Sequence, residues 1–164
     1  MILKKETIYK QDLDNKKLIV LRHFDAAPEK VWKAWTEPAL LDQWWAPKPW
    51  KAETKSMDFR EGGTWLYAMV GPEGEQHFAR VLYHQIEPVH MFSGHDGFCD
   101  ADGNPDTALP GMEWTVQFKA VADGTDVEVE VAFASIKDLE TIVEMGFKEG
   151  FAMAHDNLDE LLLG

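Results

Sequence analysis

Histidines are the residues of this chain best suited to metal binding or to acid–base chemistry. A catalytic zinc site on a helix needs two histidines four residues apart around a glutamate, and structural zinc sites usually add cysteines. The chain has no such pair, and its one cysteine, Cys99, has no second thiol with which to form a disulfide. We therefore expect no metal site. The six histidines are His23, His77, His84, His90, His95 and His155.

His155 differs from the others because it lies in the final segment, beside Phe151 and Ala154. If that segment is a helix, the imidazole lies next to its apolar face. The ordinary pKa of histidine is near neutrality, so His155 is a candidate for a polar ligand contact or an acid–base group. An exposed histidine at the rim of a pocket, without a function, is the alternative.

Known catalytic motifs are missing from the sequence. It contains no GxSxG elbow, P-loop or GxGxxG turn, so these motifs give no basis for a hydrolase, a nucleoside triphosphatase or a dinucleotide-binding protein. Asp100-Ala-Asp-Gly-Asn begins like a calcium loop, but Pro105 and Gly111 stand where such a loop needs glycine and glutamate. This stretch predicts an Asx-rich turn. We assign no catalytic residue and expect no cofactor.

Composition limits the partners and the compartment. The 164 residues suit one domain, and the formal net charge of −13 disfavours binding to nucleic acids and to anionic membranes. No stretch approaches the roughly 20 apolar residues of a membrane span. The first residues contain lysines but no apolar core of a signal peptide. We expect a cytoplasmic protein whose residues 1–15 form a loose arm or a leading strand.

The segments that must position any site are mostly strands. Residues 112–120 alternate, with Trp114 and Phe118 on the apolar side and Glu113 and Lys119 on the polar side. Such alternation is typical of an antiparallel sheet with one buried face. Two short helices, broken at Pro38, follow the first strong strand. The predicted strands are 17–24, 52–59, 64–70, 76–86, 89–99, 112–120 and 127–133.

The final segment, residues 137–164, predicts one long helix. Its apolar residues recur at spacings of three and four, which places them on one helical face. The sequence therefore predicts an α+β fold, with a curved antiparallel sheet of about six to seven strands packed on a long C-terminal helix. The residues of that face are Phe147, Phe151, Ala154, Leu158 and Leu161.

Four stretches carry a resemblance to a known family. They read RHFDAAPEKVWKAWTEPALLDQWW, MDFREGGTW, QIEP and MGFKEGF…LDELL, in that order along the chain. Across residues 17–163 the sequence resembles proteins similar to the C-terminal domain of the heat-shock ATPase activator, the AHSA1-like family of the START-like, helix-grip (SRPBCC) superfamily. The resemblance implies a helix-grip (Bet v 1-like) fold, with an apolar cavity between the long helix and the sheet.

Three functions are compatible with these observations. The first is binding of a small apolar or amphipathic molecule in the cavity, as a carrier or sensor. The second is an enzyme of polyketide cyclase or hydrolase type, which would need His155, Arg80, His84, Asp58 and Tyr67 to converge. The third is an interaction module for a chaperone in a stress response, and a homodimer is compatible with all three. The residues expected to border the cavity are Trp65, Phe78, Trp114, Phe118, Phe133, Phe147, Phe151 and His155.

Overall fold

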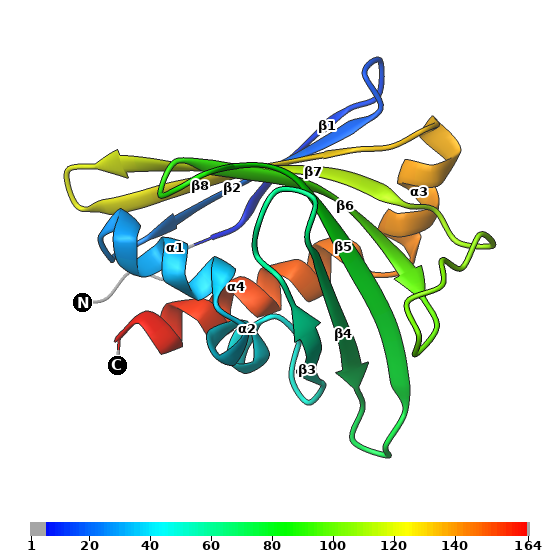
Figure 1. The fold of residues 1–164 in the computed structure, drawn as a ribbon. Helices are drawn as coiled ribbons and strands as arrows, with labels where there is room; N and C mark the ends of the chain where they lie inside the picture. The colour runs from blue at the N-terminus through cyan, green and yellow to red at the C-terminus, as the bar shows by residue number, and fades with distance from the viewer. Residues whose placement is uncertain (1–5, 164) are drawn as a thin grey trace.

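The computed structural model describes residues 6–163, which form an α+β fold in which an eight-stranded antiparallel sheet curves around a helix (Figure 1). The strands are β1 (Ile8–Asp12), β2 (Lys17–Phe24), β3 (Lys51–Met57), β4 (Thr64–Val70), β5 (Gln76–Glu87), β6 (Met91–Cys99), β7 (Met112–Val121) and β8 (Gly124–Ala132). The helices are α1 (Pro28–Thr36), α2 (Pro38–Trp44), α3 (Ile136–Glu144) and α4 (Phe147–Leu163). The strands lie in the sheet in the order β1-β2-β8-β7-β6-β5-β4-β3.

The alternating sequence pattern explains which face of the sheet is buried. Along β7 the side chains of Met112, Trp114, Val116 and Phe118 are buried, while Glu113 is exposed. The buried side chains of β2 and β8 continue this layer on neighbouring strands. Helix α4 lies against the same concave face, with α1 and α2 beside it (Figure 1). The core therefore lies between the sheet and these three helices.

Two register shifts bend the far half of the sheet. One lies between Thr54 and Ser56 of β3, and the other between Tyr83 and Ile86 of β5. An extra residue on one strand of an antiparallel pair increases the local twist and bends that strand. The bends let β3 to β6 curve around the end of α4, where the candidate site lies.

The predicted C-terminal helix is in fact two helices. Ser135 caps α3, since its hydroxyl accepts a hydrogen bond from the backbone N–H of Asp138 at 3.1 Å. Gly146 then takes a φ of +93°, a left-handed conformation that commonly ends a helix and that glycine adopts without strain. Only α4 packs along the concave face. The prediction of a single helix over residues 137–164 was therefore wrong.

The number of strands was also too low. Eight strands are present rather than six to seven, because β1 adds to the sheet edge by pairing with β2. Of the two alternatives for residues 1–15, Ile8–Asp12 thus forms a leading strand, while residues 1–5 lie outside the described part of the chain. Among residues 6–163, no helix has both the length and the apolar character that crossing a membrane requires.

Candidate ligand-binding site

A cavity of about 200 Å³ lies between α4 and the strands β4 to β7. The residues after α2 close one side of it, and the first turns of α4 close another. Its lining is mostly apolar and aromatic, which is the usual character of a small-molecule site. The lining residues are Trp45, Pro47, Tyr67, Met69, His77, Ala79, Asp96, Gly97, Phe98, Met112, Trp114, Phe147, Gly150 and Phe151.

Asp96 is the one acidic residue in this lining. It lies on β6, opposite Val81 of β5 and Met112 of β7, so it is held in the middle of the sheet. Only 6% of its surface is exposed, and its Oδ1 atom has no hydrogen-bond partner among the described residues. Burial raises the pKa of this carboxyl from 3.8 to about 7.

Aromatic side chains supply the polar groups in the cavity wall around Asp96. Trp45, Trp114 and Asp96 also border a smaller inner cavity of about 30 Å³, so they separate the two spaces. The indole Nε1 atoms of both tryptophans are buried without a hydrogen-bond acceptor in the described chain. Burial and the nearby Asp96 both raise the pKa of the Tyr67 hydroxyl, which therefore stays protonated. The site combines one carboxyl group with donors set in aromatic walls.

The structure brings together only part of the predicted set of cavity residues. Trp114, Phe147 and Phe151 line the main cavity, and Trp65 lines the inner one. Phe78 alternates with the inward-facing Ala79 on β5 and so lies on the other face of the sheet. The remaining three do not contribute to the lining of either cavity and are buried in the core. They are Phe118, Phe133 and His155. Binding of a ligand by the set stays a prediction.

His155 lies inside the core rather than at a rim. It is 1% exposed, and its ring contacts Phe151, Phe24 and Trp35, with centroids 4.1, 5.7 and 6.2 Å away. Thr7 Oγ1 accepts a hydrogen bond from Arg22 and is also hydrogen-bonded to His155 Nδ1, at 3.0 Å. Burial, aided by the positive charge of Arg22, lowers the pKa of His155 to about 3.

We therefore expect the His155 ring to remain neutral between about pH 5 and 8, outside the usual titration range of histidine. An NMR titration of the imidazole nitrogens, with His155→Gln for assignment, measures this. His23 serves as the comparison in the same spectra, because its pKa is raised rather than lowered. A His155 midpoint above about pH 5 would contradict the buried, neutral ring.

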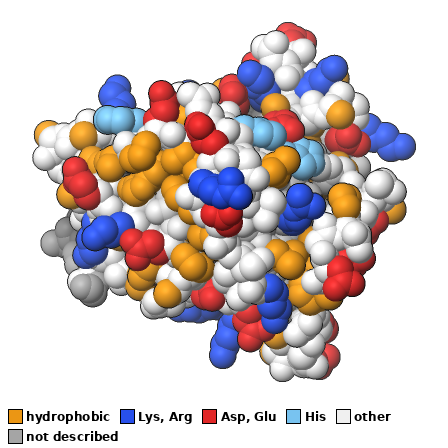
Figure 2. Space-filling model, viewed as in Figure 1, with side chains coloured by type: hydrophobic (Ala, Val, Ile, Leu, Met, Phe, Trp, Pro, Cys, Tyr) orange, Lys and Arg blue, Asp and Glu red, His pale blue; other side chains and the backbone are white. Residues whose placement is uncertain are grey.

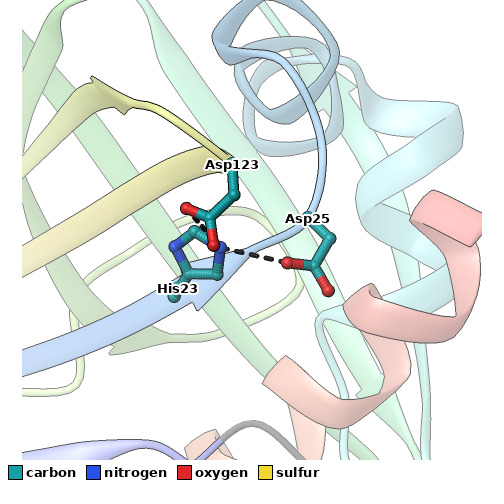
Figure 3. Close-up of side chains that lie close together, drawn as sticks. All are labelled: His23, Asp25 and Asp123. Carbon is teal, nitrogen blue, oxygen red and sulfur yellow. Dashed lines mark hydrogen bonds and ion pairs between the residues drawn. The ribbon is translucent and has the colours of Figure 1, made fainter. Parts of the chain in front are cut away.

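A second cluster, away from the cavity, surrounds His23 at the end of β2 (Figure 3). Its Nδ1 lies 2.7 Å from Asp126, and its Nε2 lies 3.0 Å from Asp25 and 3.7 Å from Asp123. Partial burial acts to lower the pKa of His23, but hydrogen bonds to Asp126 and Asp25 raise it overall. The ring thus joins β2 to the β7–β8 hairpin.

The same cluster has the spacing of a cation site. His23, Asp25 and Asp123 offer one ligand atom each, all within 4.8 Å of one another. A metal would have to displace the proton that these carboxylates stabilise on the ring. The geometry alone therefore assigns no metal here. The sequence had not predicted that Asp123 lies near His23.

The five residues of the catalytic hypothesis are scattered. Tyr67 lines the cavity, whereas His155 is buried behind it. Arg80 donates to the carbonyl of Gly103 on the other face of the sheet. The last two are on the surface. Asp58 forms an ion pair with Arg60 there, and Nε2 of His84 lies 3.1 Å from the carboxyl group of Glu113.

Comparisons with known proteins agree with this fold. Residues 25–163 match the family model described as Activator of Hsp90 ATPase homolog 1-like protein. A comparison with curated proteins gives no match.

Several solved structures are similar over nearly the whole chain. A crystal structure of the protein Ms6760 from Mycobacterium smegmatis is 32% identical, with a TM-score of 0.88 and 96% of each chain covered. A solution structure of a protein from Arthrobacter aurescens is 28% identical, with a TM-score of 0.89, covering 94% of this chain and 90% of that one. A Staphylococcus epidermidis protein is 26% identical, with a TM-score of 0.82 and coverages of 94% and 92%.

Proposed function

The chain belongs to the family of Activator of Hsp90 ATPase homolog 1-like proteins, and from this premise we propose that it binds a small hydrophobic or amphipathic molecule in the cavity beside α4, as a cytoplasmic carrier or sensor. The observation that carries the proposal is the aromatic cavity itself, with a single buried carboxyl in its wall.

The cavity volume limits the size of the ligand. Sites for drug-sized molecules usually span about 300–1,000 Å³. At about 200 Å³ this cavity suits a molecule of one or two rings better than a sterol or a long acyl chain. Trp45 and Trp114 lie in the wall, so binding is expected to change the intrinsic fluorescence. Titration of delipidated protein with fatty acids, sterols and small flavonoid-like aromatics tests the proposal.

Gly150 offers the sharpest mutational test. It lies within α4, where glycine costs about 0.5–1 kcal/mol relative to alanine. A Cβ at this position would approach only Pro47 Cγ, at 3.7 Å, so the methyl group of alanine would fit here without a clash, and a longer side chain would start at the cavity wall. Glycine here leaves room beside Trp114 and Phe151. Truncating Phe151 or Trp114 is less informative, because removing a buried aromatic costs about 3–5 kcal/mol of stability.

We expect Gly150→Ala to raise the free energy of unfolding by about 0.5–1 kcal/mol, and Gly150→Met to abolish saturable binding while the protein stays folded. Fluorescence titration and thermal unfolding measure the two effects. Met153→Ala is the matched control, because Met153 lies on the exposed face of the same helix. Unchanged ligand binding in Gly150→Met would place the ligand elsewhere.

Acid–base catalysis in the same cavity is the second candidate. It is favoured by Asp96, because a carboxyl with a pKa of about 7 can exchange protons at neutral pH. Its residues differ from those expected from the sequence, since only Tyr67 of that set lines the cavity. Turnover of a bound ligand that stops in Asp96→Asn, with binding retained, would favour this candidate over a carrier.

A chaperone-linked interaction is the third candidate. Leu13 and Ile136 are exposed and border a groove along α3. In the view of Figure 2, hydrophobic side chains also gather near α1, among scattered charges of both signs. A native pull-down with Leu13→Ser as the comparison tests this candidate, and an unchanged set of captured proteins would count against the groove.

A further inference from the structure

The carboxyl group of Asp96 has no positive partner in the cavity wall. No lysine or arginine is among the lining residues, and no ion pair of Asp96 occurs within the described part of the chain. Among the described residues one lysine or arginine is buried, Arg22, and it is bound to Asp156 and Asp159 of α4 instead. Burying a carboxylate without a positive partner costs a large free energy. Asp96 lacks the positive charge in the cavity wall that would offset this cost.

The other walls of the cavity suit a cation as well. Trp45 lies between Trp114 and Tyr67, with ring centroids 5.8 and 6.3 Å away. Aromatic faces attract ammonium groups through their quadrupoles, most strongly where water is excluded. The net charge of −13 also raises the local concentration of cations around the protein.

The cavity lining contains one histidine, His77. His77 lies on β5, is exposed, and has its ring 5.5 Å from that of Trp50. It lies on the same sheet face as Asp96, yet no ion pair joins the two. Burial raises the pKa of Tyr67 and Tyr83, so both hydroxyls stay neutral and supply no counter-charge.

We propose that the cavity selects small organic cations, in which a protonated amine pairs with Asp96 and an aromatic or alkyl body fills the space between Trp114, Phe147 and Phe151. This inference rests on the proposed ligand-binding function and names its ligand class. The rival ligand is a neutral alcohol, whose oxygen would accept a hydrogen bond from an indole N–H while its O–H donates one to the carboxylate. The amine is favoured because only a cation compensates the charge of Asp96.

Matched probes separate these ligand classes. Phenethyl, naphthylmethyl and 4-phenylbutyl compounds are titrated calorimetrically at pH 8, each as the amine, the alcohol and the carboxylate. We expect at least one amine to bind about tenfold more tightly than its alcohol, with the carboxylate weakest, since a charge-assisted hydrogen bond is about twice as strong as a neutral one. In Asp96→Asn the preference for the amine over the alcohol is expected to fall to about one.

One control variant isolates Asp96. Asp102→Asn removes a negative charge from the exposed loop after β6 without reaching the cavity. This variant should keep the preference for the amine. Equal binding of amine and alcohol would overturn the cation assignment and leave the ligand-binding function standing. An amine preference that survives in Asp96→Asn would also overturn it, and no binding of any probe would overturn both proposals.

Discussion

Replacing Asp96 with asparagine is expected to raise the free energy of unfolding at pH 8 by about 2–4 kcal/mol, because each unit of pKa shift corresponds to about 1.4 kcal/mol. The pKa of Asp96 is about 7 in the folded protein, against an ordinary value of 3.8. Between these values the folded state binds more protons than the unfolded state. The contribution of this group to stability therefore falls as the pH rises from about 4 to 7, and it is constant above that range.

Urea unfolding at a series of pH values from 5 to 8 measures the effect. Other groups titrate in the same range, so the informative quantity is the difference between wild type and Asp96→Asn, which should widen as the pH rises. Asp102→Asn is the control for the loss of one negative charge. Parallel curves for wild type and Asp96→Asn would mean that the carboxyl is already compensated in the folded protein.

The expected gain in stability bears on function. Asparagine has almost the same shape as aspartate, so stability alone would favour it at a buried site of this kind. Side chains that weaken the fold in this way are commonly those that a binding or catalytic site requires. The stability experiment thus tests the physical premise of the ligand proposal without any ligand.

Asp96 could not be identified from local sequence polarity. The stretch from His95 to Asp102 contains three aspartates and one glycine, and it looks like the start of a loop. The usable signal was the alternation of faces along a strand. Phe92, Gly94 and Asp96 occupy every second position of β6, and all three are buried. Period-two alternation predicts which face a residue takes, but it cannot predict that a carboxyl will be tolerated there.

The alternation of apolar and polar residues was sufficient to predict most of the sheet. It predicted the strands around Trp114 and the buried face that α4 covers. It did not predict β1, whose polar residues are held by pairing with β2 rather than by their own pattern. Helical spacing placed His155 near Phe151 correctly, but its hydrogen-bond partner in the core is Thr7, which is 148 residues away along the chain. Contacts of that range leave no local sequence signal.

Replacing Arg22 with methionine is expected to lower the free energy of unfolding by about 2–4 kcal/mol, the range for breaking a buried ion pair whose partners keep some hydration. Arg22 is 4% exposed and extends from the concave face of β2. Its Nη2 donates to Asp156 at 3.0 Å and to Asp159 at 2.5 Å, and its Nη1 donates to Thr7 at 3.0 Å. One side chain thus joins β2, the N-terminal segment and α4.

Lys17→Met is the matched control for Arg22→Met. Lys17 lies on the same strand and pairs with Glu130 at 3.0 Å, but both side chains are more than a third exposed, so we expect a loss below about 1 kcal/mol. Urea unfolding of both variants, with Asp159→Asn and the double variant, gives the coupling energy between Arg22 and Asp159. The pKa of His155 should rise in Arg22→Met, since a nearby positive charge is removed. Equal losses in the two methionine variants, with His155 unchanged, would show that Arg22 fills space in the core without acting through its charge.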